Sequence, residues 1–343
     1  MKFSHSETLV STKHARRAAA RRRSTPILGS MAAIDELTAA YETCTTGCGL
    51  VDRSELGKLA LTGPQAAEFL DGQLSNDIGA LEPGHGCLAT LLTPKGKMLG
   101  DVRVLALDEP GELLLICERV ALQELFDRIR RGLIGWQAEL HKRTVELALL
   151  SLVGPRADDV ARAAGLAVPG EAEHDSAGGV VRTDLGLDVL VPAERGEETL
   201  ARLTAAGAVA VAEAVAEVLR VERGRPRYGI DADADTMPAE AGITDRAVSF
   251  TKGCYVGQET VARLHWKGRP NRHLRGLRLS APAEHGAPVR AGDREAGRIG
   301  TAVVSPRLGP IALALLRREV EPGATVAVGD DGTSAEVVEL PFA

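Results

Sequence analysis

Glycine and proline recur through the C-terminal part of the chain, and this spacing constrains the fold more than any other feature of the sequence. From His273 onward one of the two comes every eight to twelve residues, with short alternating runs between them. The runs cover residues 274–279, 298–304, 311–316, 325–328 and 335–340. Short strands separated by frequent turns are typical of a small β-barrel or sandwich. We therefore predict a β-barrel domain over residues 272–343.

The residues before this domain mix strands and helices without a regular βαβ order. A chain of 343 residues is too long for one compact core, so we expect more than one domain. Residues 87–93 and 102–107 predict a hairpin closed by a turn at 94–97. Further strands are expected at 58–63, 112–117, 145–153, 180–182 and 187–191, and helices at 32–44, 65–73, 121–133, 156–164, 198–206 and 212–223. This order favours an α+β fold, with an N-terminal domain over 32–144 and a middle domain over 145–271.

Charge is distributed unevenly along the chain. Residues 1–30 hold seven Lys or Arg and one Glu, whereas the rest holds 34 basic and 46 acidic residues. Three interpretations of the basic segment 1–31 stay open: a disordered tail or translated leader, a transit peptide, or an arm that binds nucleic acid. The acidic remainder argues against a large duplex-binding surface, and an aromatic content of 3% is too low for a base-stacking platform. No apolar run reaches 18 residues, so no membrane span is expected.

The five cysteines are an odd number in a long chain. Disulfide frameworks are typical of short secreted chains, so we expect free thiols and a reducing compartment. That compartment is the bacterial cytoplasm, or the mitochondrial matrix if the basic segment is a transit peptide. Cys44 and Cys48 have three residues between them and no second Cys/His pair nearby, so no structural zinc site is expected. Cys87 and Cys117 fit buried small apolar positions.

One stretch, TKGCYVGQETVAR at residues 251–263, sets a cysteine among residues that can change its chemistry. The thiolate is the reactive form of cysteine, and a nearby positive charge or helix N-terminus lowers the pKa of a thiol. Lys252 lies two residues before Cys254, and Gly257 is expected to open a helix with Glu259 in its first turn. Gly253 allows a sharp turn or the close approach of a ligand. These residues predict either a reactive thiol on a loop or a structural cysteine in a turn.

The segment FTKGCYVGQE at residues 250–259, with Arg263 after it, resembles the signature of the YgfZ family. These folate-binding proteins are implicated in assembling or repairing iron–sulfur clusters, and they are related to the aminomethyltransferase (T-protein) of the glycine cleavage system. The resemblance covers about residues 33–343. Its other segments are FLDGQLSND at 69–77, LTPKGK at 92–97 leading to Asp101, VRTDLGLD at 181–188, RVERGRPRYG at 220–229 and MPAEAG at 237–242.

The resemblance implies three domains around a central channel, two α+β and the last a β-barrel, with segment 220–271 returning to the first domain. It also implies that tetrahydrofolate or a derivative binds in the channel. A flat, hydrogen-bonding pterin and an anionic tail suit an apolar cavity with a few placed polar groups and arginines. The residues implied to bind it are Arg220, Tyr228, Glu240, Gly253, Tyr255, Gly257, Gln258, Glu259 and Arg263. Those implied to carry chemistry are Cys254, Lys252 and Asp101, and no metal ligands are implied.

Two functions follow from the resemblance. The T-protein has an adjacent pair of aspartates where this chain has Gly100 and Asp101, and an acid where it has Cys254. A carboxylate can orient an amine or accept a proton, whereas a thiol can bind iron, attack an electrophile or be oxidised. We therefore expect a folate-binding factor, rather than a classical enzyme, that assists iron–sulfur cluster assembly or repair with Cys254 as the reactive thiol.

Its expected partners are iron–sulfur client proteins, tRNA-modifying radical enzymes included, or cluster carriers. One cysteine cannot hold a cluster alone, and Cys44 and Cys48 are candidates for extra ligands. The alternative is a folate-dependent aminomethyltransferase, or one-carbon transferase, of the T-protein type. Direct binding of nucleic acid is a third reading and is not expected.

Overall fold

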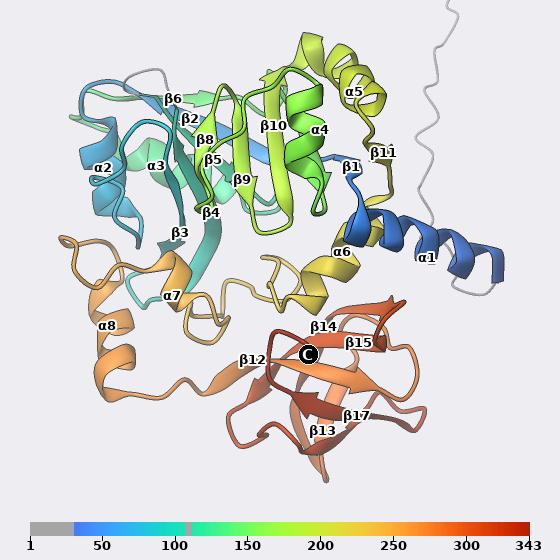
Figure 1. Cartoon of the computed structure of the whole chain (residues 1–343). Coiled ribbons are helices and arrows are strands. Elements are labelled where there is room, and N and C mark those ends of the chain that lie inside the picture. Colours follow the sequence, from blue (N-terminus) through green and yellow to red (C-terminus); the bar gives the residue numbers. More distant parts are fainter. Residues whose placement is uncertain (1–30, 108–111) are drawn as a thin grey trace, which may run out of the picture.

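The computed structural model describes residues 31–107 and 112–343, so the prediction for the basic segment falls, apart from Met31, outside the described residues. The described chain forms two β-sheets packed on each other and a closed β-barrel beneath them (Figure 1). The two sheets lie in the upper half of Figure 1, and the barrel, in orange and red, lies in the lower half. In this arrangement the two sheets and the segment that leads to the barrel meet at one place.

The first sheet has the strand order β3-β4-β5-β2-β6. Its strands are β2 (Gly57–Thr62), β3 (Gly86–Leu92), β4 (Met98–Ala106), β5 (Glu112–Cys117) and β6 (Glu139–Lys142). Two helices, α2 (Ala66–Gln73) and α3 (Leu122–Gly132), cover one face of it. Phe69 on α2 and Leu125 on α3 are buried in one core with Val102 and Val104 of β4. Because side chains alternate along a strand, the odd-numbered residues of β4 point to the opposite face.

The second sheet has the order β11-β1-β7-β10-β9-β8. Its strands are β1 (Gly49–Asp52), β7 (Leu147–Val153), β8 (Ser176–Ala177), β9 (Val180–Thr183), β10 (Gly186–Pro192) and β11 (Val209–Ala210). Two helices, α4 (Ala157–Ala163) and α5 (Gly196–Ala205, after the 3-10 turn Ala193–Arg195), pack on its outer face through Val160 and Leu203. The N-terminal helix α1 (Met31–Thr46) packs on α6 (Glu213–Glu222) through Tyr41 and Val215.

Apolar side chains join the inner faces of the two sheets. The first sheet contributes Leu105, Leu114 and Ile116, and the second contributes Leu149, Val181 and Leu190. All six are buried, so this contact is a core rather than a wet interface. Burial of apolar surface stabilises a fold by about 25 cal/mol per Å², so such a core holds the two sheets together as one body.

A connecting segment leads from α6 to the barrel and packs on the first sheet on its way. It contains α7 (Thr244–Ala247) and α8 (Gln258–Lys267). Ile243, Val248 and Tyr255 of this segment share a core with Leu92 and Met98, next to the turn between β3 and β4. The segment therefore returns to the first sheet after the chain has built the second.

The barrel closes in the order β12-β15-β14-β13-β16-β17. Its strands are β12 (Arg272–Leu279), β13 (Pro288–Ala291), β14 (Arg294–Ser305), β15 (Gly309–Arg317), β16 (Thr325–Val328) and β17 (Thr333–Val338). Its interior is filled by apolar side chains such as Leu277, Ile299 and Val337. The predicted α+β class and the predicted C-terminal barrel are confirmed.

The sheets do not follow the predicted domain boundary at residue 144. Strand β1, which lies in the predicted N-terminal domain, pairs instead with β7, Gly49 standing opposite Val153. The four residues of β1 are too few to show a periodicity, and their partners lie about a hundred residues away in the sequence. Strands β6 and β13, also four residues each, were not predicted either.

Candidate functional site

The signature loop before α8 is tied to the first domain by a buried lysine. Lys252 leaves 1% of its side chain exposed, and its ammonium lies 2.8 Å from Asp71 Oδ1. The ammonium also donates to the backbone carbonyls of Leu74, at 3.1 Å, and Asn76, at 2.8 Å, around the C-terminal end of α2. Carbonyls at a helix C-terminus carry partial negative charge and favour a cation. This corrects the expectation for Lys252. Its ammonium binds Asp71 and the carbonyls at the end of α2, so it anchors the loop rather than activating Cys254.

Cys254 stands exposed on this anchored loop. The backbone then turns at Gly257, whose φ is 87° and where a Cβ would lie 2.6 Å from the Thr93 carbonyl oxygen. Only glycine fits there, and α8 begins at the next residue, as predicted. Gly253 differs, because its φ is not positive and a Cβ would meet nothing within 4 Å. The fold therefore does not require a glycine at position 253.

The other signature residues differ in burial and in their contacts. Tyr255 is buried, which raises the pKa of its hydroxyl to about 12, and that hydroxyl has no partner among the described residues. Gln258 donates to the Gly253 carbonyl at 3.4 Å. Glu259 and Arg263 are exposed on α8. Neither Cys254 nor any of these residues lines the cavities of about 880 and 270 Å³ beside Glu240 and Asp101.

The remaining cysteines are unsuited to help Cys254 hold a metal. All five are free, and burial raises the pKa of Cys44 and Cys48 to about 11 and of Cys87 and Cys117 to about 12. Protonated thiols are poor metal ligands. Within residues 31–107 and 112–343, no group of three or more His, Cys, Asp or Glu is placed to hold a metal ion. Cys44 and Cys48 are therefore core residues, not extra ligands.

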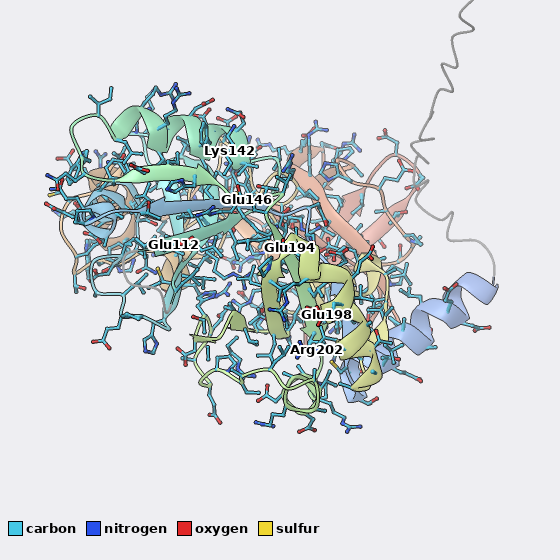
Figure 2. All side chains as sticks on the ribbon, turned by 90° about the horizontal axis from the view of Figure 1, so that it is seen from above. Glu112, Lys142, Glu146, Glu194, Glu198 and Arg202 are labelled. Carbon is cyan, nitrogen blue, oxygen red and sulfur yellow. The ribbon has the colours of Figure 1, made fainter. Side chains whose placement is uncertain are left out.

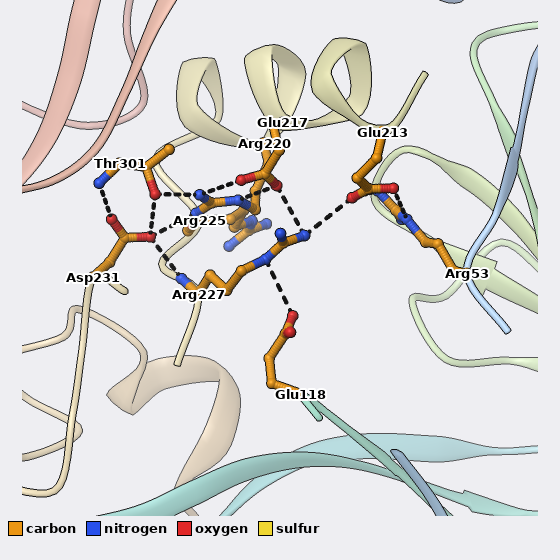
Figure 3. A network of polar contacts seen from close by, with 9 residues as sticks. All are labelled: Arg53, Glu118, Glu213, Glu217, Arg220, Arg225, Arg227, Asp231 and Thr301. Carbon is orange, nitrogen blue, oxygen red and sulfur yellow. Dashed lines mark hydrogen bonds and ion pairs between the residues drawn. The ribbon is translucent and has the colours of Figure 1, made fainter. Parts of the chain in front are cut away.

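Arg220 belongs to a network that joins α6 to the barrel (Figure 3). Its Nε lies 2.9 Å from Glu217, and its terminal nitrogens lie 2.8 Å from Asp231 and 2.6 Å from Thr301 on β14. A guanidinium whose nitrogens are all engaged has no free fork for a ligand carboxylate. The predicted folate-binding role of Arg220 is thus replaced by a structural one.

Glu240 is engaged in the same way on the other side of the connecting segment. Arg272 donates to both of its oxygens, at 3.1 and 3.0 Å, and the Met237 backbone N–H donates at 3.0 Å. Burial opposes ionisation, but these hydrogen bonds hold the pKa of Glu240 below its usual range. Glu240 lines a cavity of about 880 Å³ between this segment and the barrel. With its oxygens occupied, it is not placed to accept hydrogen bonds from a pterin.

Asp101 and Tyr228 line a second cavity, of about 270 Å³, where both sheets meet the connecting segment. The odd-numbered residues of β4 face the second sheet: Leu105 lies in the inter-sheet core, and Arg103 reaches Asp188 of β10 at 2.5 Å. One alternation further along the strand, Asp101 faces the cavity. Tyr228 donates to the Met98 carbonyl at 3.4 Å. The other charged residues on the walls include Glu118, Asp184, Arg227 and Arg246.

The Asp101 carboxyl faces this cavity without a side-chain hydrogen-bond donor in the described chain. Burial raises its pKa, while the positive charges of Arg246 and Arg227 oppose the shift. It accepts a hydrogen bond from its own backbone N–H, and within the described chain no side chain donates to it. A half-buried acid with a raised pKa, facing a cavity, is a candidate functional group. The predicted site residue Asp101 therefore faces a cavity, with no side-chain donor to its carboxyl in the described chain.

Gly100 faces away from the cavity. A Cβ at this position would lie 2.9 Å from the Ala121 side chain and 3.5 Å from Leu125 on α3. A side chain at position 100 is therefore directed under α3 and not towards Asp101. An aspartate at position 100 would therefore not add an acid to the cavity. The glycine at this position is thus no argument against a one-carbon transferase.

Most charged residues of the cavity were not predicted, among them Glu118, Arg227 and Arg246. Arg227 lies in the quoted segment 220–229, but nothing in the sequence distinguishes it from Arg220. Arg246 forms an ion pair with Glu173 of a loop in the second domain, a contact with no sequence signal. Glu118 directly follows the predicted strand 112–117, and only the register of β4 and β5 would have revealed it.

The outer surface of the two-sheet body carries charges of both signs. Figure 2 shows it from above, with Glu112, Lys142, Glu146, Glu194, Glu198 and Arg202 labelled. Many of these charges are paired locally, as where Arg143 reaches Glu146 at 2.6 Å. Within the described part of the chain, no helix has both the length and the apolar character needed to cross a membrane.

Fold and cavity together place the chain in a class: a two-sheet body, closed by a small barrel, with an acid-lined cavity at the junction. Residues 25–168 match the GCVT N-terminal domain family, and residues 272–343 match the glycine cleavage T-protein C-terminal barrel domain. An aminomethyltransferase from Rubrobacter xylanophilus is 30% identical over 323 residues, covering 89% of this chain and 86% of that protein. One from Streptomyces coelicolor is 31% identical over 325 residues, covering 87% of each.

A solved structure shares the fold. The crystal structure of the glycine cleavage system aminomethyltransferase T from Bartonella henselae matches with a TM-score of 0.81 and 24% identity, covering 90% of this chain and 89% of that one. On these matches, the chain belongs to the aminomethyltransferase (glycine cleavage T-protein) family.

Proposed function

We propose that the chain binds a tetrahydrofolate in the Asp101 cavity and acts in one-carbon transfer of the aminomethyltransferase type. The observation that carries this proposal is the Asp101 carboxyl, which faces the cavity without a side-chain partner in the described residues. Membership of the family supports it, since relatives at 30% and 31% identity over most of both chains are named aminomethyltransferases.

The residues of the cavity fit the ring system of a folate. Tetrahydrofolate, when bound, supplies the nitrogens that carry a one-carbon unit. Its amino group and ring N–H groups require acceptors, and Asp101 and Glu118 both stand on the cavity walls. A volume of about 270 Å³ suits a ring system better than a whole folate with its tail. The tail would then extend beyond this cavity.

Within this proposal, Asp101 orients the reacting amine or accepts its proton. Burial raises its pKa, which makes the carboxylate a stronger base than an exposed aspartate. The apolar contact of the two sheets, with Ile116 on the cavity wall, keeps water from one side of it. A protein group that transfers a proton in the transition state contributes about 10²- to 10⁴-fold in rate.

A second candidate is the iron–sulfur assembly or repair factor that the signature implies. The observation that favours it is the exposed Cys254 on a loop anchored by Lys252, next to a glycine that the fold does not require. A single thiol cannot hold a cluster, so a client or carrier protein would have to supply the other ligands. The free thiols support a reducing compartment, the cytoplasm or the mitochondrial matrix.

The two candidates are separated by comparing Asp101→Asn with Cys254→Ser. The assay measures transfer from an aminomethylated carrier protein to tetrahydrofolate. One-carbon transfer predicts turnover by the wild type, a loss of about 100-fold or more in Asp101→Asn, and near-normal rates in Cys254→Ser. The second candidate predicts no turnover by any of them. It also predicts low activity of iron–sulfur enzymes in cells that carry only Cys254→Ser. Normal iron–sulfur enzyme activity in those cells, with no turnover in vitro, would reject both.

A further inference from the structure

Glu118 directly follows the last residue of β5, the strand that pairs with β4, and Asp101 lies on β4. The antiparallel register of β4 and β5 pairs Val104 with Leu115 and Arg103 with Ile116. Carried two residues further, the same register sets Asp101 against Glu118, just beyond the end of β5. Residues directly opposite each other have Cβ atoms about 4.5–5.5 Å apart and share one face. Both acids accordingly line the same cavity.

Two like charges in this position destabilise a sheet, so the arrangement needs a reason. Burial raises the pKa of Glu118, Arg227 opposes the shift, and the negative charge of Asp101 adds to it. Arg227 partly offsets the repulsion, with its Nε 3.2 Å from a Glu118 oxygen. Figure 3 shows Glu118 reaching towards Arg227 from the strand side, apart from the acids on α6.

Of the three acids around Arg227, Glu118 is the least firmly held. Glu213 takes two hydrogen bonds from Arg53, and Glu217 takes two from Arg220. The Arg227 Nε that faces Glu118 is buried and forms no aligned hydrogen bond in the described structure. The carboxylate oxygens of Glu118 are therefore available to a ligand, whereas those of Glu213 and Glu217 are occupied by arginines.

We propose that Glu118 is the second carboxyl of the ligand site and accepts hydrogen bonds from the N–H groups of the folate's 2-amino-4-oxopyrimidine ring. An amino group beside a ring N–H presents two parallel donors, which match the two oxygens of a carboxylate. Asp101, on the facing strand, is then left for the reacting amine. This assignment rests on the proposed folate binding.

Calorimetric titration of the full chain with tetrahydrofolate tests the assignment. The variants are Glu118→Gln and, as a matched control, Glu124→Gln, which removes an exposed acid from α3. Loss of a charged hydrogen-bond acceptor costs about 1.5–3 kcal/mol, so Glu118→Gln is expected to weaken binding about 10-fold or more. The control is expected to bind within twofold of the wild type.

A second readout separates ligand contact from a structural role. If the ligand binds the ionised form of Glu118, binding near the raised pKa releases protons. Titrations in buffers of different ionisation enthalpy count these protons. The charged groups facing Glu118 are Arg227, Asp101, Glu217 and Arg220, and they stay in place in Glu118→Gln. We expect this variant to release fewer protons than the wild type, and Glu118→Asp, which restores the charge, to recover part of the release.

The outcomes are distinguishable. If the wild type does not bind tetrahydrofolate, the proposed function itself fails. If the wild type binds and Glu118→Gln matches it in affinity and in protons released, folate binding stands and the role of Glu118 is overturned. Weaker binding by a variant with an unchanged melting temperature and fewer protons released supports the assignment.

Discussion

The ammonium of Lys252 lies 2.8 Å from Asp71 Oδ1, although the two residues are 181 positions apart in the sequence. This buried pair joins the signature loop to the end of α2. Removing one partner leaves the other uncompensated, which costs about 3–5 kcal/mol for fully buried pairs and less here because Asp71 keeps some exposure. We expect Lys252→Met to lose about 2–3 kcal/mol of unfolding free energy in urea. Lys267→Met, on the exposed end of α8, serves as control; equal losses in the two variants would contradict the anchoring role.

The same pair has a pH dependence. Burial opposes ionisation of Asp71, but hydrogen bonds from Lys252 and the backbone hold its pKa below the usual range. An acid with a depressed folded pKa stabilises the fold above its unfolded pKa, about 3.9, and loses this effect as the pH falls through the folded value. The gap in unfolding free energy between wild type and Lys252→Met should be full at pH 7 and shrink below about pH 4. A gap that grows on acidification would refute the pairing.

The ionised Asp101 carboxyl is expected to lower the unfolding free energy of the chain, although it serves the proposed function. Burial raises its pKa, so the folded state holds its proton more tightly than the unfolded chain does. The stabilising effect of that proton is present below the unfolded pKa, about 3.9, and is lost as the pH rises through the folded value. Asp101→Asn should therefore gain about 1 kcal/mol in unfolding free energy at pH 8, and less at pH 5. Asp293→Asn, in an exposed barrel turn, should show neither change. An Asp101→Asn variant that is less stable than the wild type at pH 8 would contradict the expectation that burial destabilises the ionised Asp101.

The two glycines of the signature loop are expected to respond differently to alanine. At Gly257 the φ of 87° and the Thr93 oxygen, 2.6 Å from a Cβ, predict a loss of about 1–3 kcal/mol in Gly257→Ala. At Gly253 neither obstacle exists, so Gly253→Ala should unfold within about 0.5 kcal/mol of the wild type. Urea titration compares them. A Gly253→Ala variant that is stable but inactive in cells would assign that glycine to partner contact; a large loss of stability would show that the loop geometry is wrong.

Thiol reactivity provides a direct check on the cysteines. Cys254 is exposed, whereas burial raises the pKa of Cys44 and Cys117 to about 11 and 12. Thiolate-selective reagents require exposure and ionisation. The native chain should therefore titrate one thiol quickly with a disulfide reagent, none in Cys254→Ser, and five after denaturation of the wild type. Two or more fast thiols in the native protein would be inconsistent with the raised pKa of the other four thiols and with their limited exposure.

Much of the fold was predictable because its signals are local. The turn residues at 94–97 and the alternation around them predicted the hairpin β3–β4, and the glycine and proline spacing predicted the barrel. Gly257 opens α8 as expected, since a glycine next to a polar first turn is a local signal. The short strand β1 was missed because its pairing with β7 depends on residues far along the chain.

The site was predictable only in part, because its groups meet through long-range register. Asp101 was named through the family resemblance, and the cavity supports it. Lys252 was assigned to chemistry and Arg220 to folate binding, but their partners, Asp71 and Asp231, occupy their charges, and such pairings are invisible in the sequence. Glu118 needed the alignment of β4 with β5, which a list of strands does not contain.

The location of a bound folate tests the central claim most directly. A crystal structure of the chain with tetrahydrofolate would show which cavity holds the ring. We predict ring density in the cavity of about 270 Å³, with the Asp101 and Glu118 carboxylates in hydrogen-bond contact with it. Ring density in the larger cavity beside Glu240, or against Cys254 with the Asp101 cavity empty, would contradict this account.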